Sequence, residues 1–253
     1  MTELLHTRVF GERGPLVALL HGWGWDGRLM APLAEALGGR ARVVQPDLPG
    51  YGLNADRDCT DFEDCVDQLM ATVPDADVVV GWSLGGLLAL RWASLVPLRK
   101  LALIGATPRF MQASDWPHGM SAERFDAFAD AFEDAPMKAR TRFAALSALG
   151  DADARQVRAT MAGLVEQPPL PSRQALDRGL HWLHHVDLRE AVHGVSARVL
   201  CLHGAEDRVV DAAACDWMSS AAGAHCVRVP GAAHLPWLQG GVADLCEWVG
   251  ADD

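Results

Sequence analysis

Three side chains of this 253-residue sequence could together supply a nucleophile, a base and an acid. Ser83 lies in Gly81-Trp82-Ser83-Leu84-Gly85, which fits the G-x-S-x-G pattern of a nucleophilic serine. Asp207 and His234 come later in the chain, each directly after a short apolar run. A serine hydroxyl needs a base to accept its proton, and the base needs an acid to orient it. This order of residues predicts acyl transfer through a covalent intermediate.

The surroundings of Ser83 favour this interpretation over a chance match. β-Branched residues precede the motif, and a helix-like run of Leu and Ala follows it. A strand that feeds directly into a helix strains the residue at the turn and holds its side chain beside the helix N-terminus. Glu206, the neighbour of Asp207, is the alternative acid, and the sequence leaves this alternative open.

Acyl transfer also needs hydrogen-bond donors for the negative oxygen of the tetrahedral intermediate. The backbone N–H of Leu84 is one candidate, because this residue directly follows the nucleophile. The second candidate is the N–H of Trp23, in a loop where Gly22 and Gly24 favour close backbone approach. We expect the indoles of Trp23 and Trp82 to form an apolar wall beside the scissile bond.

Short apolar runs predict the strands that position these loops. Most lack strict alternation, which is typical of strands buried on both faces of a parallel sheet. The predicted strands are 16–20, 41–46, 77–82, 101–105, 198–204 and 226–229. Helical patterns lie between them, at 28–37, 61–73, 84–95, 212–222 and 242–249. This alternation predicts an α/β fold with a doubly wound, mostly parallel central sheet flanked by helices.

The alternation stops between about residues 107 and 191. This part of the chain predicts helices only, at 122–133, 137–149, 152–165 and 173–183. A helical block inserted into an α/β sheet is most simply a lid over the edge where active sites form. We therefore expect a core of residues 1–107 and 191–253 with an all-helical cap of residues 108–190.

Composition excludes several other classes of protein. The chain is 50% hydrophobic but has no apolar run of transmembrane length, and its first residues lack the apolar segment of a signal peptide. Six cysteines are scattered without a C-x-x-C pair, which favours reduced thiols, a cytoplasmic location and no metal site. The net charge of −11 argues against nucleic-acid binding.

The charge is unevenly distributed. Residues 136–160 hold five basic and two acidic residues, a net charge of +3, which leaves −14 for the rest of the chain. The basic residues are Lys138, Arg140, Arg142, Arg155 and Arg158. They could merely solvate helix faces, or they could form a docking surface for an acidic partner.

With these residues identified, the sequence resembles the α/β-hydrolases. The segments "HGWGWDGRLM", "DLPGYG", "GWSLGG", "HGAEDRVV" and "AAHLPWL" match the ordered landmarks of that superfamily across the whole chain. A narrower similarity, carried by "GWSLGGL", "ASDWPHGM", "RFAALSALG" and "VDLRE", is to the BioH-type carboxylesterases of biotin synthesis. The resemblance therefore implies an α/β-hydrolase fold.

That family hydrolyses the methyl ester of a pimeloyl chain on acyl-carrier protein, without a cofactor. The resemblance implies that acyl-carrier protein is the partner. From the apolar runs and the net charge we expect no membrane or nucleic-acid partner, and we expect a monomer. The resemblance implies substrate contacts at Trp23, Ser83, Leu84, Phe143, Ala144, Ala145, Leu146, Ser147 and His234. It implies carrier docking at Lys138, Arg142, Arg155 and Arg158, the last displaced by about one position from the family pattern.

Two other functions remain open from the sequence. The first is a broad carboxylesterase for small soluble esters, because one scaffold hosts many chemistries. The second is a binding protein of hydrolase fold that does not turn over an ester. Hydrolysis of a short p-nitrophenyl ester would separate the binding protein from the enzymes.

Overall fold

Seven β-strands form one sheet in the computed structural model, which describes residues 4–251. Their order across the sheet is β1-β3-β2-β4-β5-β6-β7. β1 pairs antiparallel with β3, and every other neighbouring pair of described strands is parallel. This confirms the predicted α/β class. The strands are β1 (Thr7–Phe10), β2 (Leu16–Leu20), β3 (Arg42–Pro46), β4 (Val78–Trp82), β5 (Lys100–Ile104), β6 (Arg198–Gly204) and β7 (His225–Val229).

The six strands predicted from apolar runs are β2 to β7, each within one residue of its expected ends. The sequence analysis predicted no strand at β1. This strand has four residues and lies at the edge of the sheet, and Val9 within it is 55% exposed. A short edge strand buries too little to show a continuous apolar run.

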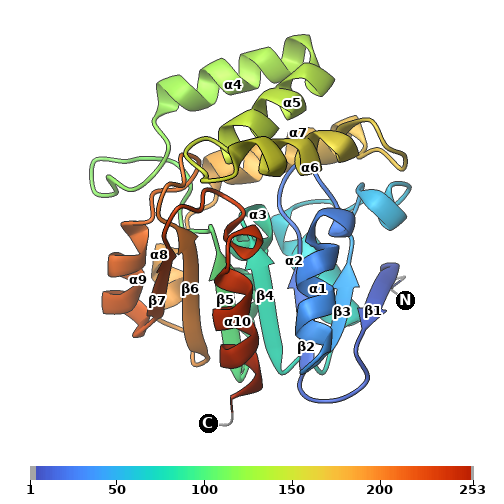
Figure 1. Ribbon diagram of the computed structural model, residues 1–253, viewed down its shortest axis with the longest axis vertical. Coiled ribbons are helices and arrows are strands. Elements are labelled where there is room, and N and C mark those ends of the chain that lie inside the picture. Colours follow the sequence, from blue (N-terminus) through green and yellow to red (C-terminus); the bar gives the residue numbers. More distant parts are fainter. Residues whose placement is uncertain (1–3, 252–253) are drawn as a thin grey trace.

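Helices cover both faces of the sheet (Figure 1). One face carries α1 (Ala31–Gly38) and α10 (Gly241–Gly250), which contact each other. The other carries α2 (Phe62–Thr72), α3 (Leu84–Leu95) and α8 (Arg189–Val192), while α9 (Ala214–Ala222) packs beside β6 and β7. The short helix α8 and three single-turn 3₁₀ helices, at Gly27–Met30, Gly52–Asn54 and Pro236–Leu238, were not predicted.

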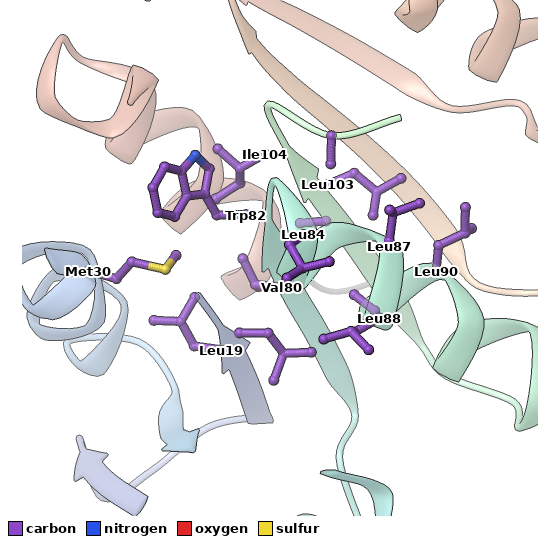
Figure 2. Close-up of a cluster of buried hydrophobic side chains, with 14 of the residues drawn as sticks. Leu19, Met30, Val80, Trp82, Leu84, Leu87, Leu88, Leu90, Leu103 and Ile104 are labelled. Carbon is purple, nitrogen blue, oxygen red and sulfur yellow. The ribbon is translucent and has the colours of Figure 1, made fainter. Parts of the chain in front are cut away.

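The densest part of the core lies where β4 meets α3. Figure 2 shows Val80 and Trp82 of β4 on the side of the strand that carries Met30, and Leu87 and Leu88 of α3 on the other side, and all of these side chains are buried. Helix α3 is apolar on nearly every side because other elements surround it. Burying each such leucine stabilises the fold by about 1.5–3 kcal/mol. The turn between β4 and α3 is therefore held firmly from both sides.

Apart from the short α8, the helices between β5 and β6 in the chain sit above the sheet in Figure 1. They are α4 (Ala122–Asp134), α5 (Pro136–Ser147), α6 (Ala154–Val165) and α7 (Arg173–His185). All lie within residues 108–190, the range predicted for a cap. Residues 1–3 and 252–253 of the predicted core lie outside the described chain. None of the described helices is long and apolar enough to span a membrane.

An ion-pair cluster joins the two ends of this inserted segment. Asp187 accepts hydrogen bonds from the guanidinium of Arg109 at 2.5 Å and from that of Arg189 at 2.7 Å. Partial burial opposes ionisation of Asp187, but the bonds from Arg189 and Arg109 prevail and lower its pKa to about 2. One ion-pair cluster thus holds together the two places where the chain leaves and re-enters the core.

Candidate active site

Ser83 occupies the turn between β4 and α3 in a strained conformation. Its φ of 54° and ψ of −116° make it the single non-glycine residue with positive φ in the described chain. Such strain costs about 1–3 kcal/mol and persists only where the surroundings enforce it. Gly81 shows why small residues flank the turn, because a Cβ there would lie 2.2 Å from the carbonyl oxygen of Gly85. The strand–turn–helix context expected for a nucleophilic serine is present.

His234 and Asp207 meet beyond the ends of β7 and β6. Nδ1 of the fully buried His234 lies 2.8 Å from Oδ2 of Asp207. The other carboxylate oxygen accepts hydrogen bonds from the backbone N–H groups of Val209 at 2.8 Å and Val210 at 3.1 Å. The backbone N–H of His234 donates to the carbonyl of Ser147 at 3.0 Å. An ionised carboxylate held in this way places the proton of the neutral imidazole on Nδ1.

The alternative acid, Glu206, does not take this position. Its carboxylate lies 3.7 Å from the guanidinium of Arg208, and its side chain is 43% exposed. Gly105, with φ of 49°, lets the end of β5 approach the pair, since a Cβ there would lie 3.1 Å from Nδ1 of His234. Of the two candidates, the structure therefore brings Asp207 to the histidine.

Ser83 lines a pocket, and His234 contacts two side chains next to it, those of Trp82 and Phe143. The indole N–H of Trp82, the residue before Ser83, donates to the carbonyl of His234 at 2.9 Å, and the two rings are 5.3 Å apart. Phe143 lines the pocket together with Ser83, and its ring is 6.2 Å from that of His234. Between residues 4 and 251, neither the Ser83 hydroxyl nor Nε2 of His234 has a hydrogen-bond partner. Such bonds often tighten only when substrate binds.

The prediction for the position of the Trp82 side chain was wrong. We expected its indole to form a wall beside the scissile bond, but the side chain is fully buried and does not line the pocket. It packs against His234 and, edge to face at 5.3 Å, against Trp237. Residues of a strand point alternately to its two faces, so the residue before the pocket-facing Ser83 is directed into the core. Trp23 does line the pocket, as expected.

The loop after β2 approaches the nucleophile closely. A Cβ on Gly22 would lie 3.1 Å from Cβ of Ser83 and 2.8 Å from the ring of Trp82, so only glycine fits. Neither the N–H of Trp23 nor that of Leu84 donates to an acceptor within the described part of the chain. Both donors are therefore available to an oxygen bound beside Ser83.

His21 shapes this loop from the core side. Its Nε2 accepts a hydrogen bond from the backbone N–H of Leu48 at 2.9 Å, so the proton resides on Nδ1, which donates to the carbonyl of Gly22 at 2.9 Å. Burial lowers the pKa of His21, which keeps the ring neutral as this pattern requires. The carbonyl of Gly22 belongs to the same peptide group as the N–H of Trp23. His21 thus fixes the peptide that carries the expected donor.

The pocket beside Ser83 is almost entirely apolar. Ser83 and Arg124 are its polar lining residues, and the rest of the lining comes from core loops, the segment before α4 and the helices α4, α5 and α7. The apolar lining residues are Trp23, Phe110, Met120, Phe125, Phe128, Phe143, Leu146, Leu180, Leu183 and Val209. Such a surface suits an extended hydrocarbon chain better than a polar ligand.

The predicted contact segment 143–147 is only partly in the pocket. Phe143 and Leu146 line it, because residues three apart on a helix share a face. Ala144 is fully buried behind them, and Ala145 lies on the exposed face of α5. Ser147 contributes its carbonyl to His234. Helical spacing indicates that these five residues do not share one face, but the tertiary structure decides which face is turned to the pocket.

Sequence reasoning missed the contribution of α4 to the pocket. Arg124, Phe125 and Phe128 of this helix line it, and the next aromatic on the same face, Phe132, packs against Trp23 with ring centres 5.7 Å apart. The spacing of three and four residues between these aromatics was the available signal for a helix face turned toward the site.

The basic residues of the 136–160 segment divide into two groups. Lys138 and Arg142 on α5 and Arg155 and Arg158 on α6 are exposed, and none of the four forms an ion pair with a described residue. Helices α5 and α6 are neighbours. Arg140 is different, because it is only 2% exposed. No group of three or more His, Cys, Asp or Glu side chains in residues 4–251 is arranged to hold a metal ion.

Comparison with known proteins identifies relatives over most of the chain. The model of the alpha/beta hydrolase family matches residues 17–245. A pimeloyl-[acyl-carrier protein] methyl ester esterase of Xanthomonas oryzae pv. oryzae is 37% identical over 241 residues, covering 92% of this chain and 93% of the relative. One of Aromatoleum aromaticum is 37% identical over 236 residues, covering 88% and 92%.

Solved structures show the same fold at lower identity. An esterase from Exiguobacterium antarcticum superposes with a TM-score of 0.83 at 20% identity, covering 97% of this chain and 95% of the other. An enol-lactonase from Burkholderia xenovorans gives a TM-score of 0.80 at 22% identity, covering 97% and 96%. Because such distant neighbours differ in activity, they establish the architecture alone.

Proposed function

The chain belongs to the alpha/beta hydrolase family, and from that premise we propose that it is a serine carboxylesterase that hydrolyses the methyl ester of pimeloyl-[acyl-carrier protein]. The observation that carries the chemistry is the Asp207–His234 hydrogen bond beside the strained Ser83. The substrate follows from the named relatives, which match this chain over about nine-tenths of its length. The product, a free carboxylate at the end of the pimeloyl chain, serves biotin synthesis.

The reaction uses each group in turn. Nε2 of His234 accepts the proton of Ser83 while Oγ attacks the ester carbonyl carbon, and Asp207 holds the imidazole in its orientation. The N–H groups of Trp23 and Leu84 stabilise the oxyanion. The tetrahedral intermediate collapses, the C–O bond to the methoxy group breaks, and the proton on His234 leaves with it as methanol. Water then attacks the acyl-enzyme with the same proton transfers and releases the carboxylate.

The apolar lining of the pocket supports this acyl chain as its occupant. With the methyl ester at Ser83, the methylenes lie against the aromatic and aliphatic wall from α4, α5 and α7. Burying each methylene contributes about 0.8 kcal/mol, so the five of a pimeloyl chain supply up to about 4 kcal/mol. The thioester end points away from the nucleophile toward the carrier. Arg124, the charged residue of the lining, offers a donor to a polar group of the arm.

The carrier binds to the cap, residues 108–190, in this proposal. Acyl-carrier protein is acidic, whereas this chain has a net charge of −11 and would repel it elsewhere. Lys138, Arg142, Arg155 and Arg158 are exposed on neighbouring helices and have no acidic partner in the described chain. Complementary charge of this kind raises the association rate and orients the encounter.

A cytoplasmic, monomeric enzyme completes the proposal. The six cysteines are free thiols, spread over α2, β6, α9, β7, α10 and the segment before α2. Reduced thiols in a chain of this size are typical of the cytoplasm, where the carrier-bound intermediates of acyl synthesis also occur.

Hydrolysis of pimeloyl-[acyl-carrier protein] methyl ester, compared with the same methyl ester free of carrier, tests the proposal. We expect kcat/KM at least about 10-fold higher for the carrier-bound ester at low ionic strength, and a smaller ratio in about 0.5 M salt, because screening weakens charge attraction. Equal turnover of both esters would remove the carrier and leave a general carboxylesterase. No turnover of either ester, or of a short p-nitrophenyl ester, would leave a binding protein.

A further inference from the structure

The loop that carries the Trp23 donor is held mainly by the cap. The indole N–H of Trp23 donates to the carbonyl of Leu176 on α7 at 2.8 Å. The indole N–H of Trp25 donates to the carbonyl of Met161 on α6 at 3.1 Å. Between them, the carbonyl of Gly24 accepts two hydrogen bonds from Arg140 on α5. Three cap helices thus bind three consecutive residues of one core loop.

Helix α4 also holds this loop, through ring contacts. Phe128 and Phe132 lie edge to face with Trp23, with ring centres 5.5 Å and 5.7 Å away, and Phe143 of α5 contacts it from another side at 5.5 Å. Gly179 of α7 lies so close that a Cβ there would be 2.5 Å from the Trp23 ring. Loops are usually mobile surface segments, whereas this one is immobilised on all sides.

Arg140 is unusual among the cap residues that hold this loop. Its Nε and Nη2 donate to the carbonyl oxygen of Gly24 at 2.9 Å and 2.7 Å, and its Nη1 donates to the carbonyl of Val165 at 2.8 Å. The guanidinium lies 5.8 Å from the ring centre of Trp25. It forms no ion pair with a described carboxylate. Burial lowers its pKa, although Tyr51 and Asp26 act in the opposite direction.

A buried cation without a carboxylate is costly, since carbonyl dipoles replace only part of the lost hydration. An apolar side chain of similar length would fill the same space at lower cost to folding. The planar guanidinium group of Arg140, however, donates two hydrogen bonds to one carbonyl and a third to another carbonyl. An apolar side chain or a single ammonium group cannot do this. Arginine at position 140 is therefore better explained by its orientation of the backbone than by a gain in stability.

The backbone that it orients includes the expected oxyanion donor. The peptide group of Gly22 and Trp23 is fixed on the core side, where His21 donates to the carbonyl of Gly22 at 2.9 Å. Two residues later, Arg140 fixes the carbonyl of Gly24, whose φ of 85° is open to few other residues. The N–H of Trp23 lies between these two fixed points. Displacing either end would turn this N–H away from the oxyanion, for which donors must be placed within a few tenths of an ångström.

We propose that Arg140 is a positioning residue that couples the cap to the oxyanion hole, so that the cap is part of the catalytic machinery as well as a cover for the pocket. The inference rests on the proposed esterase activity and deepens it. Arg140 acts through Gly24 on the N–H of Trp23 and does not touch substrate. Its loss should weaken binding of the transition state while leaving binding of the ester unchanged.

The test compares Arg140→Met and Arg140→Lys with Arg28→Met as a matched control. Arg28 also joins the core to the cap segment, donating to the carbonyls of Gln167, Pro168 and Pro169, but it does not bind Gly24. Measurements are kcat and KM for p-nitrophenyl butyrate, the melting temperature, and the inhibition constant of a trifluoromethyl ketone. Ser83 Oγ adds to that ketone as its proton passes to His234, which forms an oxyanion that mimics the intermediate.

We expect Arg140→Met to lower kcat about 10- to 100-fold, with KM within about twofold. The inhibition constant of the trifluoromethyl ketone should rise by the same factor as kcat falls. Arg140→Lys should recover part of both losses, and Arg28→Met should keep both values within about twofold while lowering the melting temperature. A folded Arg140→Met variant with wild-type kcat and ketone affinity would overturn the proposal, as would a loss confined to KM.

If Arg140→Met does not fold, Arg140→Lys decides the matter, and wild-type kcat and ketone affinity in that variant overturn the proposal. The result is separable from the pimeloyl assignment. A wild-type protein that cleaves p-nitrophenyl butyrate but not the carrier-bound methyl ester would contradict the substrate and leave the Arg140 comparison intact. A wild-type protein that cleaves neither ester would contradict the esterase itself.

Discussion

In the sheet core, helix α3 is buried on almost every side, whereas the cap helices α5 and α6 present exposed, basic faces to solvent. The core places Ser83, Asp207 and His234 by backbone geometry, through strand ends and a strained turn. The cap contributes pocket-lining side chains and binds the loop that carries Trp23. In the proposed mechanism, the core determines which bond is attacked, and the cap determines which molecule is attacked and how well its oxyanion is held.

The largest effect should come from the core. Ser83→Ala is expected to lower kcat by about 10⁴- to 10⁶-fold for every ester, because no other group can form the acyl-enzyme. Ester hydrolysis and circular dichroism check this. Ser94→Ala on the same helix α3, whose hydroxyl donates only to the carbonyl of Arg91, is the control and should stay within about twofold. Substantial activity in Ser83→Ala would break the assignment of chemistry to the core.

The next effect tests which acid serves the core. Asp207→Asn should lower kcat by about 10⁴-fold, because the amide can favour the wrong imidazole tautomer and cannot stabilise the imidazolium. Glu206→Gln is the matched control and should change kcat by less than about threefold, since Glu206 faces Arg208. Steady-state kinetics at pH 7 and pH 8.5 measure both variants. A larger loss in Glu206→Gln than in Asp207→Asn would reverse the assignment.

An intermediate effect should come from the exposed face of the cap. Replacing Lys138, Arg142 and Arg155 by alanine should lower kcat/KM for the carrier-bound ester about 10- to 100-fold at low salt. The free methyl ester should change by less than about twofold, because the charges lie outside the pocket. The same measurement at high salt should reduce the difference.

A charge-matched triple variant controls for the loss of three positive charges. Arg13, Arg40 and Arg42 are exposed near the amino-terminal ends of β2 and β3, far in the fold from the cap. Their replacement by alanine should leave the carrier preference within about twofold. An equal loss in both triple variants would show that net charge acts without a defined docking surface.

The smallest effect concerns the ion-pair cluster of Arg109, Asp187 and Arg189, where cap and core join. Asp187→Asn should lower the free energy of unfolding at pH 7 by no more than about 1 kcal/mol, because the pairs with Arg109 and Arg189 are partly exposed. The pKa of Asp187 is lowered to about 2 in the folded state, so its contribution is present above the ordinary value of 3.8 and is lost as the pH falls through about 2. Urea unfolding at pH 7 and at pH 3 should show a smaller difference between wild type and variant at the lower pH. A constant difference would contradict the ionic origin.

Most of the sheet could be predicted, and the reason is burial. Strands β2, β4 and β5 are apolar over nearly their whole length because parallel strands inside a sheet are covered on both faces, so each appears in the sequence as an almost continuous run. Strands β3, β6 and β7 include polar residues but keep a shorter apolar stretch. The edge strand β1 has no such run and was missed. The expectation for Trp82 failed for a related reason, since alternation along β4 directs it away from the pocket that Ser83 faces.

The cap was harder to predict in detail. Helical spacing placed α4 to α7, but it did not show that Ala145 would be exposed or that Phe125 and Phe128 would line the pocket. Arg140 was counted with the surface charges, because its neighbours Lys138 and Arg142 have the same polarity and the sequence does not state which face of a short amphipathic helix is covered.

By itself the sequence determined the fold class, the order of the three reactive side chains and the turn that carries Ser83, because these depend on apolar runs and local backbone geometry. The tertiary structure alone decided which acid meets His234, which face of each cap helix turns inward, and that Arg140 binds Gly24 across 116 positions of chain. Contacts between segments so distant in sequence leave no periodic signal, and their energies arise only when packing removes water from both partners.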